Sequence, residues 1–340
     1  MSTLTIEIAP SEETGKLQVM HLKRYWNKTL LKKQGRLEQG SLAEEWQTDV
    51  MLLSAIGLGL HQCLLYLYQN GDSFEQFENW IVETTGGLDS VKVAQFNASF
   101  IGEKITDEET DEPDVLDAAD HAFWDENGYV IVRNAVPKED CDLAIAAICD
   151  FLGIDRHDPS TWYGDHPSRN GIMVQMFQHP VFDRNRNAPK IRKAYQEIWR
   201  RKDVLVNTDR VGFNPPQTEA FHFYGPYLHW DVSLQLPIPF GTQGILYLAD
   251  TAENQGAFTL VPGFQHKIDE WIGSLPAGAN PRQQDIYALG PKPIAANAGD
   301  FILWHQALPH GSSPNTTALP RFVQYINYEP LDHKHADVWI

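Results

Sequence analysis

The 340-residue chain has few cysteines and a deficit of positive charge. It contains only Cys63, Cys141 and Cys149, a small and odd number that excludes a disulfide framework, and the last two are expected to share one helix, too far apart to bond. Lysine and arginine total 27 against 45 aspartates and glutamates, which gives a net charge of −18. Because a sequence-independent grip on nucleic acid needs a basic face, nucleic acid is not expected as a partner.

Long apolar runs are also scarce. The only candidate for a membrane span is segment 50–68, which has no formal charge but includes Ser54, Gly57 and His61. This composition is more typical of a buried helix than of a span. The first residues lack the basic start and apolar middle of a secretory signal. The sequence therefore predicts a cytoplasmic protein with no membrane partner.

The composition that is present favours a large folded core. Hydrophobic residues make up 42% of the chain and aromatic residues 11%, which excludes disorder as the overall state. The first hundred residues have helical patterns, and acidic residues then crowd the stretch after Glu103, as in a self-repelling linker. The sequence predicts a helical N-terminal domain over 1–102, an acidic linker over 103–118 and a second domain over 119–340.

A basic run lies in the first predicted helix. Its members are Lys23, Arg24, Lys28, Lys32, Lys33 and Arg36. Such a run is usually a solvated helix face, and the alternative is a docking surface for an acidic partner or for the acidic remainder of the chain. The N-terminal helices are therefore a candidate module for homodimerisation or for contact with a carrier protein.

The second predicted domain begins with helices and continues as β-structure. Short apolar runs at 233–240, 244–250, 257–264, 300–306 and 321–330 are separated by glycine, proline, asparagine and aspartate, which is typical of strands. Many short strands without helices between them favour an antiparallel sandwich or barrel over a parallel sheet. The expected fold class is therefore α+β.

Three polar side chains in this β-region are candidate metal ligands. On a strand, His229 and Asp231 would point to the same face, although an exposed polar strand face is the other interpretation of this pair. His310 follows a second apolar strand. Two histidines and one carboxylate leave three positions of an octahedral ion open, which is the facial triad of non-haem Fe(II) oxygenases.

The same set of residues includes a candidate cosubstrate anchor. Arg321 begins a strand face that continues with Val323 and Tyr325. A buried arginine on an apolar face needs an anionic partner, and its planar fork suits a carboxylate. A 2-oxo acid could chelate the metal through two open positions, leave the third to O2 and place its far carboxylate on Arg321.

With these residues in order, the sequence resembles the phytanoyl-CoA dioxygenase-like (PhyH) family of Fe(II)/2-oxoglutarate-dependent oxygenases over roughly residues 119–330. The motifs that carry the resemblance are FWDENGYVIVRNAVPKEDC, His229-x-Asp231, ENQGAFTLVPGFQHK and GDFILWHQALPHGSSPN, followed by Arg321. The resemblance implies a double-stranded β-helix core of the jelly-roll or cupin-like type with flanking helices. It also implies iron on His229, Asp231 and His310. By the same match, 2-oxoglutarate would contact Arg321, Ser312 and Gln175.

The implied reaction is hydroxylation of an unactivated C–H bond in a small metabolite, with release of succinate and CO2. An amino acid, free or carrier-tethered, is the first expectation for the substrate and an acyl-CoA is the second. Related halogenases have a small residue in place of the carboxylate, so Asp231 favours hydroxylation. Desaturation or epimerisation with the same cosubstrates and, in another class, a catalytically silent metal-binding scaffold are the alternatives.

Other polar residues receive weaker assignments. His305 is expected to be a core histidine or to support a ligand, and His222 to face away from His229. Asn214 stands where many relatives have a lysine. A local basic patch that could accommodate a CoA ester comprises Arg169, Arg184, Arg186, Lys190 and Arg192.

Overall fold

The computed structural model describes residues 8–71, 73–100, 112–330, 332–334, 336 and 339–340. The chain divides into two compact units, Met1–Thr110 with Pro330–Asp332, and Asp111–Glu329 with His333–Ile340. Part of the predicted linker lies outside the described residues. In its remainder, the backbone N–H groups of Val115 and Leu116 donate to the carboxylate of Glu197, and Leu116 is buried. Val115 and Leu116 are therefore packed structure, while Pro113, Asp114 and Asp117 are exposed.

The described part of the first unit is helical. Its α-helices are α1 (Leu22–Lys33), α2 (Trp46–Ala55), α3 (Leu60–Asn70), α4 (Phe74–Thr85) and α5 (Ser90–Phe100). The Ser73 hydroxyl accepts from the Gln76 backbone N–H at the start of α4, and Gly86 ends that helix at φ 72°, where a side chain would be strained. A side-chain cap and a left-handed glycine thus set the two ends of α4.

The uncharged segment 50–68 is divided between two helices. Helix α2 ends at Ala55 and α3 begins at Leu60, and the pair is bent by 94°. Among the described residues, no single helix is long and apolar enough to cross a membrane, and this bent pair reaches the required length and composition only when both helices are taken together.

Basic residues of α1 form a buried ion-pair network inside the first unit. Lys28 is 2% exposed, and its Nζ lies 2.7 Å from both Glu45 Oε2 and Asp49 Oδ1. Arg24 donates to the other oxygen of Glu45, and His21 Nε2 lies 3.0 Å from Asp49 Oδ1. The interpretation of the basic run as a solvated face is therefore wrong for Lys28, while Arg36 is exposed.

This network predicts an acid-sensitive contribution to stability. Burial by itself would raise the pKa of Glu45, but hydrogen bonds from Arg24 and Lys28 lower it to about 2. A carboxylate whose pKa is lower in the folded than in the unfolded state stabilises the fold at any pH above its unfolded-state pKa. This stabilisation is lost as the pH falls toward the folded-state pKa. We expect Glu45→Gln to lower the free energy of unfolding by about 2–3 kcal/mol at neutral pH. The deficit should shrink as the pH falls from 4.5 toward about 2.

Urea unfolding of the full chain, followed by tryptophan fluorescence at neutral and acidic pH, measures this effect. The neighbouring Glu44 is exposed and supplies the matched control, Glu44→Gln. Equal stabilities of the Glu45 variant and the parent at neutral pH would contradict the network's contribution.

The described part of the second unit combines helices with antiparallel strands. Its α-helices are α6 (Ala118–Asn127), α7 (Lys138–Leu152), α8 (Pro180–Arg186), α9 (Pro189–Trp199) and α10 (Ile268–Ser274). The large sheet has the order β1 (Tyr129–Val132), β9 (Phe301–His305), β6 (Thr242–Tyr247), β11 (Arg321–Tyr325), β5 (Val211–Asn214), β3 (Met173–Val174), β2 (Arg169–Asn170). A smaller sheet has the order β10 (His310–Ser312), β7 (Phe258–Leu260), β8 (Lys292–Pro293), and β4 (Val204–Val206) pairs with β12 (Tyr328–Pro330).

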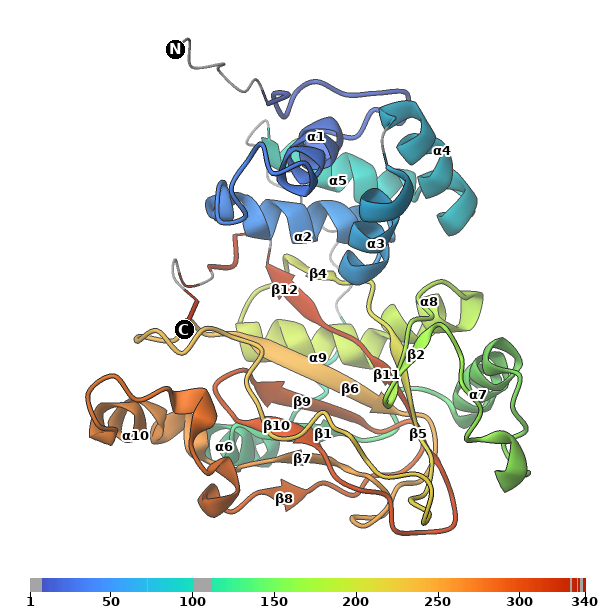
Figure 1. Ribbon diagram of the computed structural model, residues 1–340. Coiled ribbons are helices and arrows are strands. Elements are labelled where there is room, and N and C mark those ends of the chain that lie inside the picture. The colour runs from blue at the N-terminus through green and yellow to red at the C-terminus, as the bar shows by residue number, and fades with distance from the viewer. Residues whose placement is uncertain (1–7, 72, 101–111, 331, 335, 337–338) are drawn as a thin grey trace. The chain divides into compact units, whose positions relative to one another are not determined.

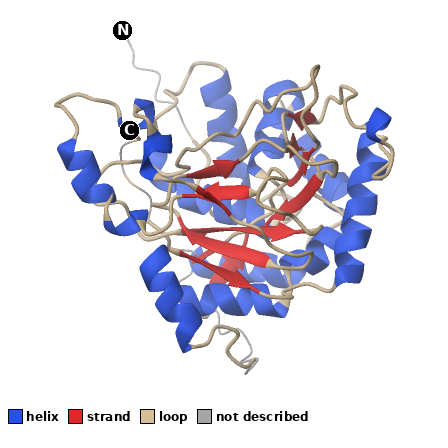
Figure 2. Ribbon diagram, turned by 90° about the horizontal axis from the view of Figure 1, so that it is seen from below, coloured by secondary structure: helices blue, strands red, loops and turns tan. Residues whose placement is uncertain are grey.

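Alternation along the strands divides the interior of this unit into two cores. Leu246 on β6 and Leu303 on β9 pack with residues of helices α7 and α9. Their neighbours Ile245 and Ile302 face the other way and pack with residues of β7 in the small sheet. Figures 1 and 2 show the strands gathered in the middle of the unit with helices around them. The helix-flanked, double-stranded β-helix core and the α+β class are thus confirmed.

Two local expectations have different outcomes. Segment 233–240 forms no strand in the described structure; Pro237 and Pro239 lack the backbone N–H that a ladder needs. Cys141 and Cys149 both lie on α7, buried and free, as predicted.

Candidate metal and cosubstrate site

The two candidate histidine ligands are joined by their own backbones. His310 begins β10, and His229 forms an isolated antiparallel bridge with it. Each backbone N–H donates to the other residue's carbonyl oxygen at 2.9 Å. The ring centroids are 4.8 Å apart. This bridge places the imidazoles of two residues far apart in sequence side by side.

Backbone carbonyls also orient both rings. His229 Nδ1 lies 2.7 Å from the carbonyl oxygen of Tyr227, and His310 Nδ1 lies 3.0 Å from that of Leu308. A carbonyl oxygen only accepts, so each Nδ1 carries a proton, and in the neutral ring each Nε2 is left as the nitrogen that could bind a metal.

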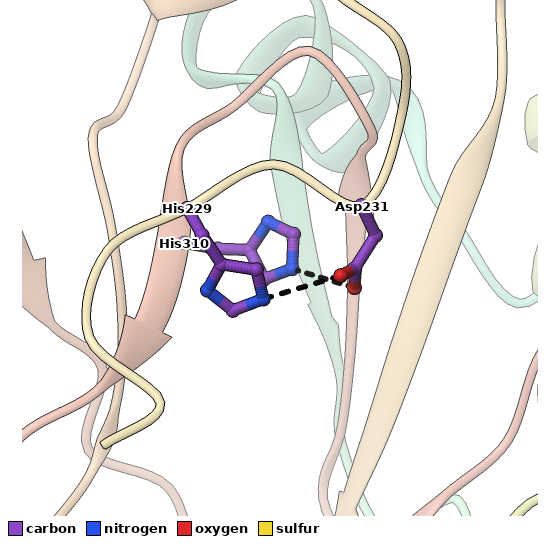
Figure 3. A group of neighbouring side chains, drawn as sticks. All are labelled: His229, Asp231 and His310. Carbon is purple, nitrogen blue, oxygen red and sulfur yellow. Dashed lines mark hydrogen bonds and ion pairs between the residues drawn. The ribbon is translucent and has the colours of Figure 1, made fainter. Parts of the chain in front are cut away.

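Asp231 completes the cluster. Its Oδ1 lies 3.2 Å from His229 Nε2 and its Oδ2 lies 3.4 Å from His310 Nε2, and Figure 3 shows both rings directed at the carboxylate. One ligand atom from each residue lies within 4.8 Å of the other two. The expectation that His229 and Asp231 share a regular strand is wrong, because Asp231 lies on a bend, but the two side chains do meet.

The electrostatics of the cluster fit a bound cation. Partial removal from water would by itself raise the pKa of Asp231, yet the hydrogen bonds and charges of His229 and His310 hold it far below its usual range. Burial alone would lower the pKa of His229, and the bond to Asp231 outweighs this and leaves it raised. When the rings are neutral, two nitrogen lone pairs and a carboxylate face one point, which is the donor set of a 2-His-1-carboxylate iron site.

A second group with metal-ligand chemistry, His21, Glu45 and Asp49, differs in one respect. The ammonium of Lys28 already contacts both carboxylates at 2.7 Å. A cation is therefore built into this group, which we assign as the structural ion-pair network of the first unit. No such ammonium contacts Asp231 among the described residues.

Arg321 lies on the inner face of β11, as predicted, and is fully buried. Its Nη1 donates to the Ser312 hydroxyl at 3.1 Å. Among the described residues, Nε and Nη2 have no hydrogen-bond partner. A buried cation with unpaired donors is costly unless an anion completes it, and a carboxylate fits this fork. The site therefore suits the far carboxylate of a 2-oxo acid.

The other candidate cosubstrate contacts, Gln175 and Asn214, lie near Arg321 in the sheet without a hydrogen bond to it in the described structure. Gln175 follows β3, and its Oε1 is buried without a partner; within the described structure, no hydrogen bond joins its side chain to Arg321 or Ser312. Asn214 is paired across the strands with Arg321, and its Oδ1 also has no partner. Asn214 lies on β5, which pairs with β11, and Gln175 follows β3, the next strand of the sheet. Both residues stay candidates for cosubstrate contact.

The competing histidines do not join the cluster. His305 lies next to Trp304 on β9 and packs against Phe240 and Trp124. Burial, assisted by the charge of His266, lowers the pKa of His305 to about 4. His222 is exposed. His305 is thus a packed histidine outside the cluster, as expected.

The structure adds two residues that sequence reasoning missed. Gln243 Nε2 donates to Asp231 Oδ2 at 2.8 Å, and Arg282 donates to the carbonyl oxygens of Trp230 and Val232, which flank Asp231. Neither belongs to a motif quoted above, and glutamine and arginine carry no metal-ligand signal. Only the tertiary contacts identify them.

Similarity to known proteins covers the part of the chain that holds this cluster. The sequence model of the family described as Phytanoyl-CoA dioxygenase (PhyH) matches residues 124–323. A Dictyostelium discoideum protein with the proposed name phytanoyl-CoA dioxygenase is 25% identical over 262 residues, covering 62% of this chain and 74% of that protein. The non-heme α-ketoglutarate-dependent epimerase SnoN from nogalamycin biosynthesis is 15% identical (TM-score 0.47; 62% of this chain, 82% of SnoN). Iron-bound EctD from S. alaskensis is 18% identical (TM-score 0.47; 67% of this chain, 82% of EctD).

Proposed function

Because the chain belongs to the phytanoyl-CoA dioxygenase family of non-haem iron, 2-oxoglutarate-dependent oxygenases, we propose that it hydroxylates an unactivated C–H bond of a small metabolite. The cosubstrates of this class are 2-oxoglutarate and O2, and the products besides the alcohol are succinate and CO2. We assign His229, Asp231 and His310 as the Fe(II) ligands. We assign Arg321, assisted by Ser312, as the anchor of 2-oxoglutarate.

The observation that carries this proposal is the combination of the open cluster with the unpaired guanidinium. A closed four-ligand site would leave no room for a cosubstrate, whereas two imidazoles and one carboxylate leave open positions. The bound iron would supply oxygen activation coupled to oxidative decarboxylation of the 2-oxo acid.

The chain's own residues orient and neutralise the reactants. Tyr227 and Leu308 hold the two imidazoles as neutral Nε2 ligands through their carbonyl oxygens. Asp231 contributes one negative charge, which partly compensates a ferrous ion. Arg321, whose side chain is fully buried, would compensate the far carboxylate of 2-oxoglutarate, and a charge-assisted fork is strongest away from water.

For the substrate, we propose an amino acid, free or carrier-tethered, ahead of an acyl-CoA. The basic patch that could have received a CoA ester is already engaged. Arg184 pairs with Asp140, and Arg186 is buried among carbonyl oxygens and Asp183. Lys190 donates to a backbone carbonyl. These contacts favour a substrate without several phosphate charges.

Several finer features stay predictions. Desaturation or epimerisation would use the same residues, because such outcomes differ only in the fate of the substrate radical. A cytoplasmic location, a homodimer and a carrier-protein contact through the N-terminal helices also rest on the sequence alone.

The function is tested by following succinate release from 2-oxoglutarate under air, with Fe(II) and a panel of free amino acids, carrier-tethered amino acids and acyl-CoAs. Substrate-stimulated succinate release, with a product heavier by one oxygen atom, is the expected result. A product lighter by two hydrogens would indicate desaturation. Stimulation by acyl-CoAs alone would overturn the substrate assignment.

Removal of the carboxylate predicts a new anion site. Asp231→Gly removes both the volume and the negative charge of the carboxylate beside the two histidines. We therefore expect the variant, loaded with Co(II) and 2-oxoglutarate, to bind chloride in that space. The measurement is a chloride-dependent shift of its visible absorption, absent in the parent protein. Asp231→Asn, which keeps the volume, is the control and should respond less. An unchanged spectrum in the glycine variant would contradict the expected exchange.

A further inference from the structure

Asp231 differs from the two histidines in how it is supported. His229 and His310 are joined by a backbone bridge and held by carbonyl oxygens on Nδ1. Asp231 lies on a bend outside any strand, and its side chain is 53% exposed. A half-exposed carboxylate on a bend has rotamer freedom that no sheet ladder removes. Other contacts must therefore set its direction.

Gln243 supplies one such contact from the middle of the large sheet. It lies on β6 opposite Trp304 of β9, and its Nε2 is 2.8 Å from Asp231 Oδ2. A carboxylate only accepts, so the amide nitrogen must be the group that faces it. A neutral amide holds the oxygen without bringing a positive charge that would compete with a metal ion. The bond fixes the direction of the carboxylate and leaves lone pairs on its oxygens that could bind a metal ion.

Arg282 supplies the second contact, on the backbone. It lies on the short 3-10 helix η4 (Pro281–Gln283), between α10 and β8. Its Nη1 donates to the carbonyl oxygen of Trp230 at 2.7 Å and its Nη2 to that of Val232 at 2.6 Å. The planar fork thus bridges the carbonyl oxygens of the two residues that flank Asp231, which a lysine ammonium cannot reproduce.

The remaining contacts of Arg282 hold the guanidinium in place. Its Nε donates to the carbonyl oxygen of Ile340 at 3.1 Å, and its guanidinium lies 5.0 Å from the ring centroid of Trp339. All three guanidinium nitrogens therefore donate hydrogen bonds, and two of these bonds hold the backbone of the bend.

We propose that Gln243 and Arg282 are positioning residues that brace Asp231, the amide fixing its carboxylate and the guanidinium its backbone. This inference rests on the proposed iron site. Its consequence is that metal affinity depends on two residues that touch no metal. Outer partners of metal ligands typically contribute about 10–100-fold to affinity, and we expect losses in this range.

The test is anaerobic titration of the full chain with Co(II), followed by visible absorption, and repeated with Fe(II). Gln243→Met removes the donor at similar length, and Arg282→Lys keeps the charge but loses the fork. Each is expected to weaken binding about 10–100-fold and to alter the Co(II) spectrum. Gln243→Lys should bind still more weakly, because its ammonium would pair with Asp231 and compete with the metal.

Matched controls separate the brace from general destabilisation. Gln196→Met, on α9, removes an amide donor to the carbonyl oxygen of Lys202, and Arg201→Lys alters a surface pair with Asp203. Both variants should bind Co(II) like the parent. Thermal unfolding without metal should differ little between Gln243→Met and the parent, since the replaced side chain is only half-buried.

The outcomes distinguish the brace from the iron site itself. A parent protein that binds no Co(II), or binds it equally well after His310→Ala, would overturn the proposed function. A parent that binds through His310, with parent-like affinity and spectrum in Gln243→Met and Arg282→Lys, would overturn the brace alone. Parent-like binding in Arg282→Lys with loss in Gln243→Met would show that charge suffices at position 282 and would overturn the role of the fork.

Discussion

His310→Ala is expected to abolish stoichiometric binding of Fe(II) or Co(II) and, with it, 2-oxoglutarate-dependent succinate release. The variant leaves one imidazole and one carboxylate, which cannot hold a divalent ion against water at an exposed site. Since outer-shell partners alone contribute about 10–100-fold, the loss of a ligand should exceed about 100-fold in affinity.

The backbone makes this variant informative. The bridge between His310 and His229 uses only main-chain groups, so alanine can keep it. The His310 ring is buried against Trp304, so its loss leaves a cavity and the metal-free variant should unfold at a somewhat lower temperature than the parent. Metal should then raise the unfolding temperature of the parent but not of the variant, because only the parent binds it.

His229→Ala should reproduce the loss, and His222→Ala, which alters an exposed histidine of the same loop, should not. Parent-like Co(II) affinity in His310→Ala would remove the site assignment. Loss of binding in His222→Ala alone would move the site elsewhere in the loop.

Arg321→Met is expected to raise the 2-oxoglutarate concentration required for half-maximal succinate release by roughly two to four powers of ten. The parent guanidinium has two unpaired donor atoms, Nε and Nη2, in a fully buried position. Hydrogen bonds to charged groups contribute about 1.5–3 kcal/mol each, and each 1.4 kcal/mol is about tenfold in affinity.

A second readout separates this role from a structural one. Because the free chain buries a cation without an anionic partner on those atoms, Arg321→Met should not destabilise the metal-free, cosubstrate-free protein. Co(II) affinity without 2-oxoglutarate should also stay at the parent value. The variant thus loses the cosubstrate while keeping the fold and the metal.

Ser312→Ala should have a smaller effect on the 2-oxoglutarate requirement than Arg321→Met. It removes only the hydroxyl that accepts from Nη1, and its effect on 2-oxoglutarate should be less than about tenfold, as for one neutral hydrogen bond. An unchanged 2-oxoglutarate requirement in Arg321→Met would reassign the anchor, with Gln175 and Asn214 as the next residues to test.

Much of the fold was predictable because it depends on local chemistry. The cap at Ser73, the glycine at position 86 and the helix that carries Cys141 and Cys149 follow from short-range hydrogen bonding and periodicity. The inner face that begins at Arg321 follows from the two-residue period of a strand. Segment 233–240 has the apolar pattern of a strand but forms none, because its prolines lack the N–H groups that a strand ladder needs.

The sequence by itself determined which chemical groups the site contains: two imidazoles, a carboxylate and an arginine on an apolar strand face. Only the tertiary structure decided that His229 and His310 pair through their backbones, that Gln243 and Arg282 reach Asp231, and that Lys28 is buried in an ion-pair network. The physical reason is that side-chain periodicity specifies a face, whereas contacts between distant residues depend on strand register and on which groups burial leaves without water.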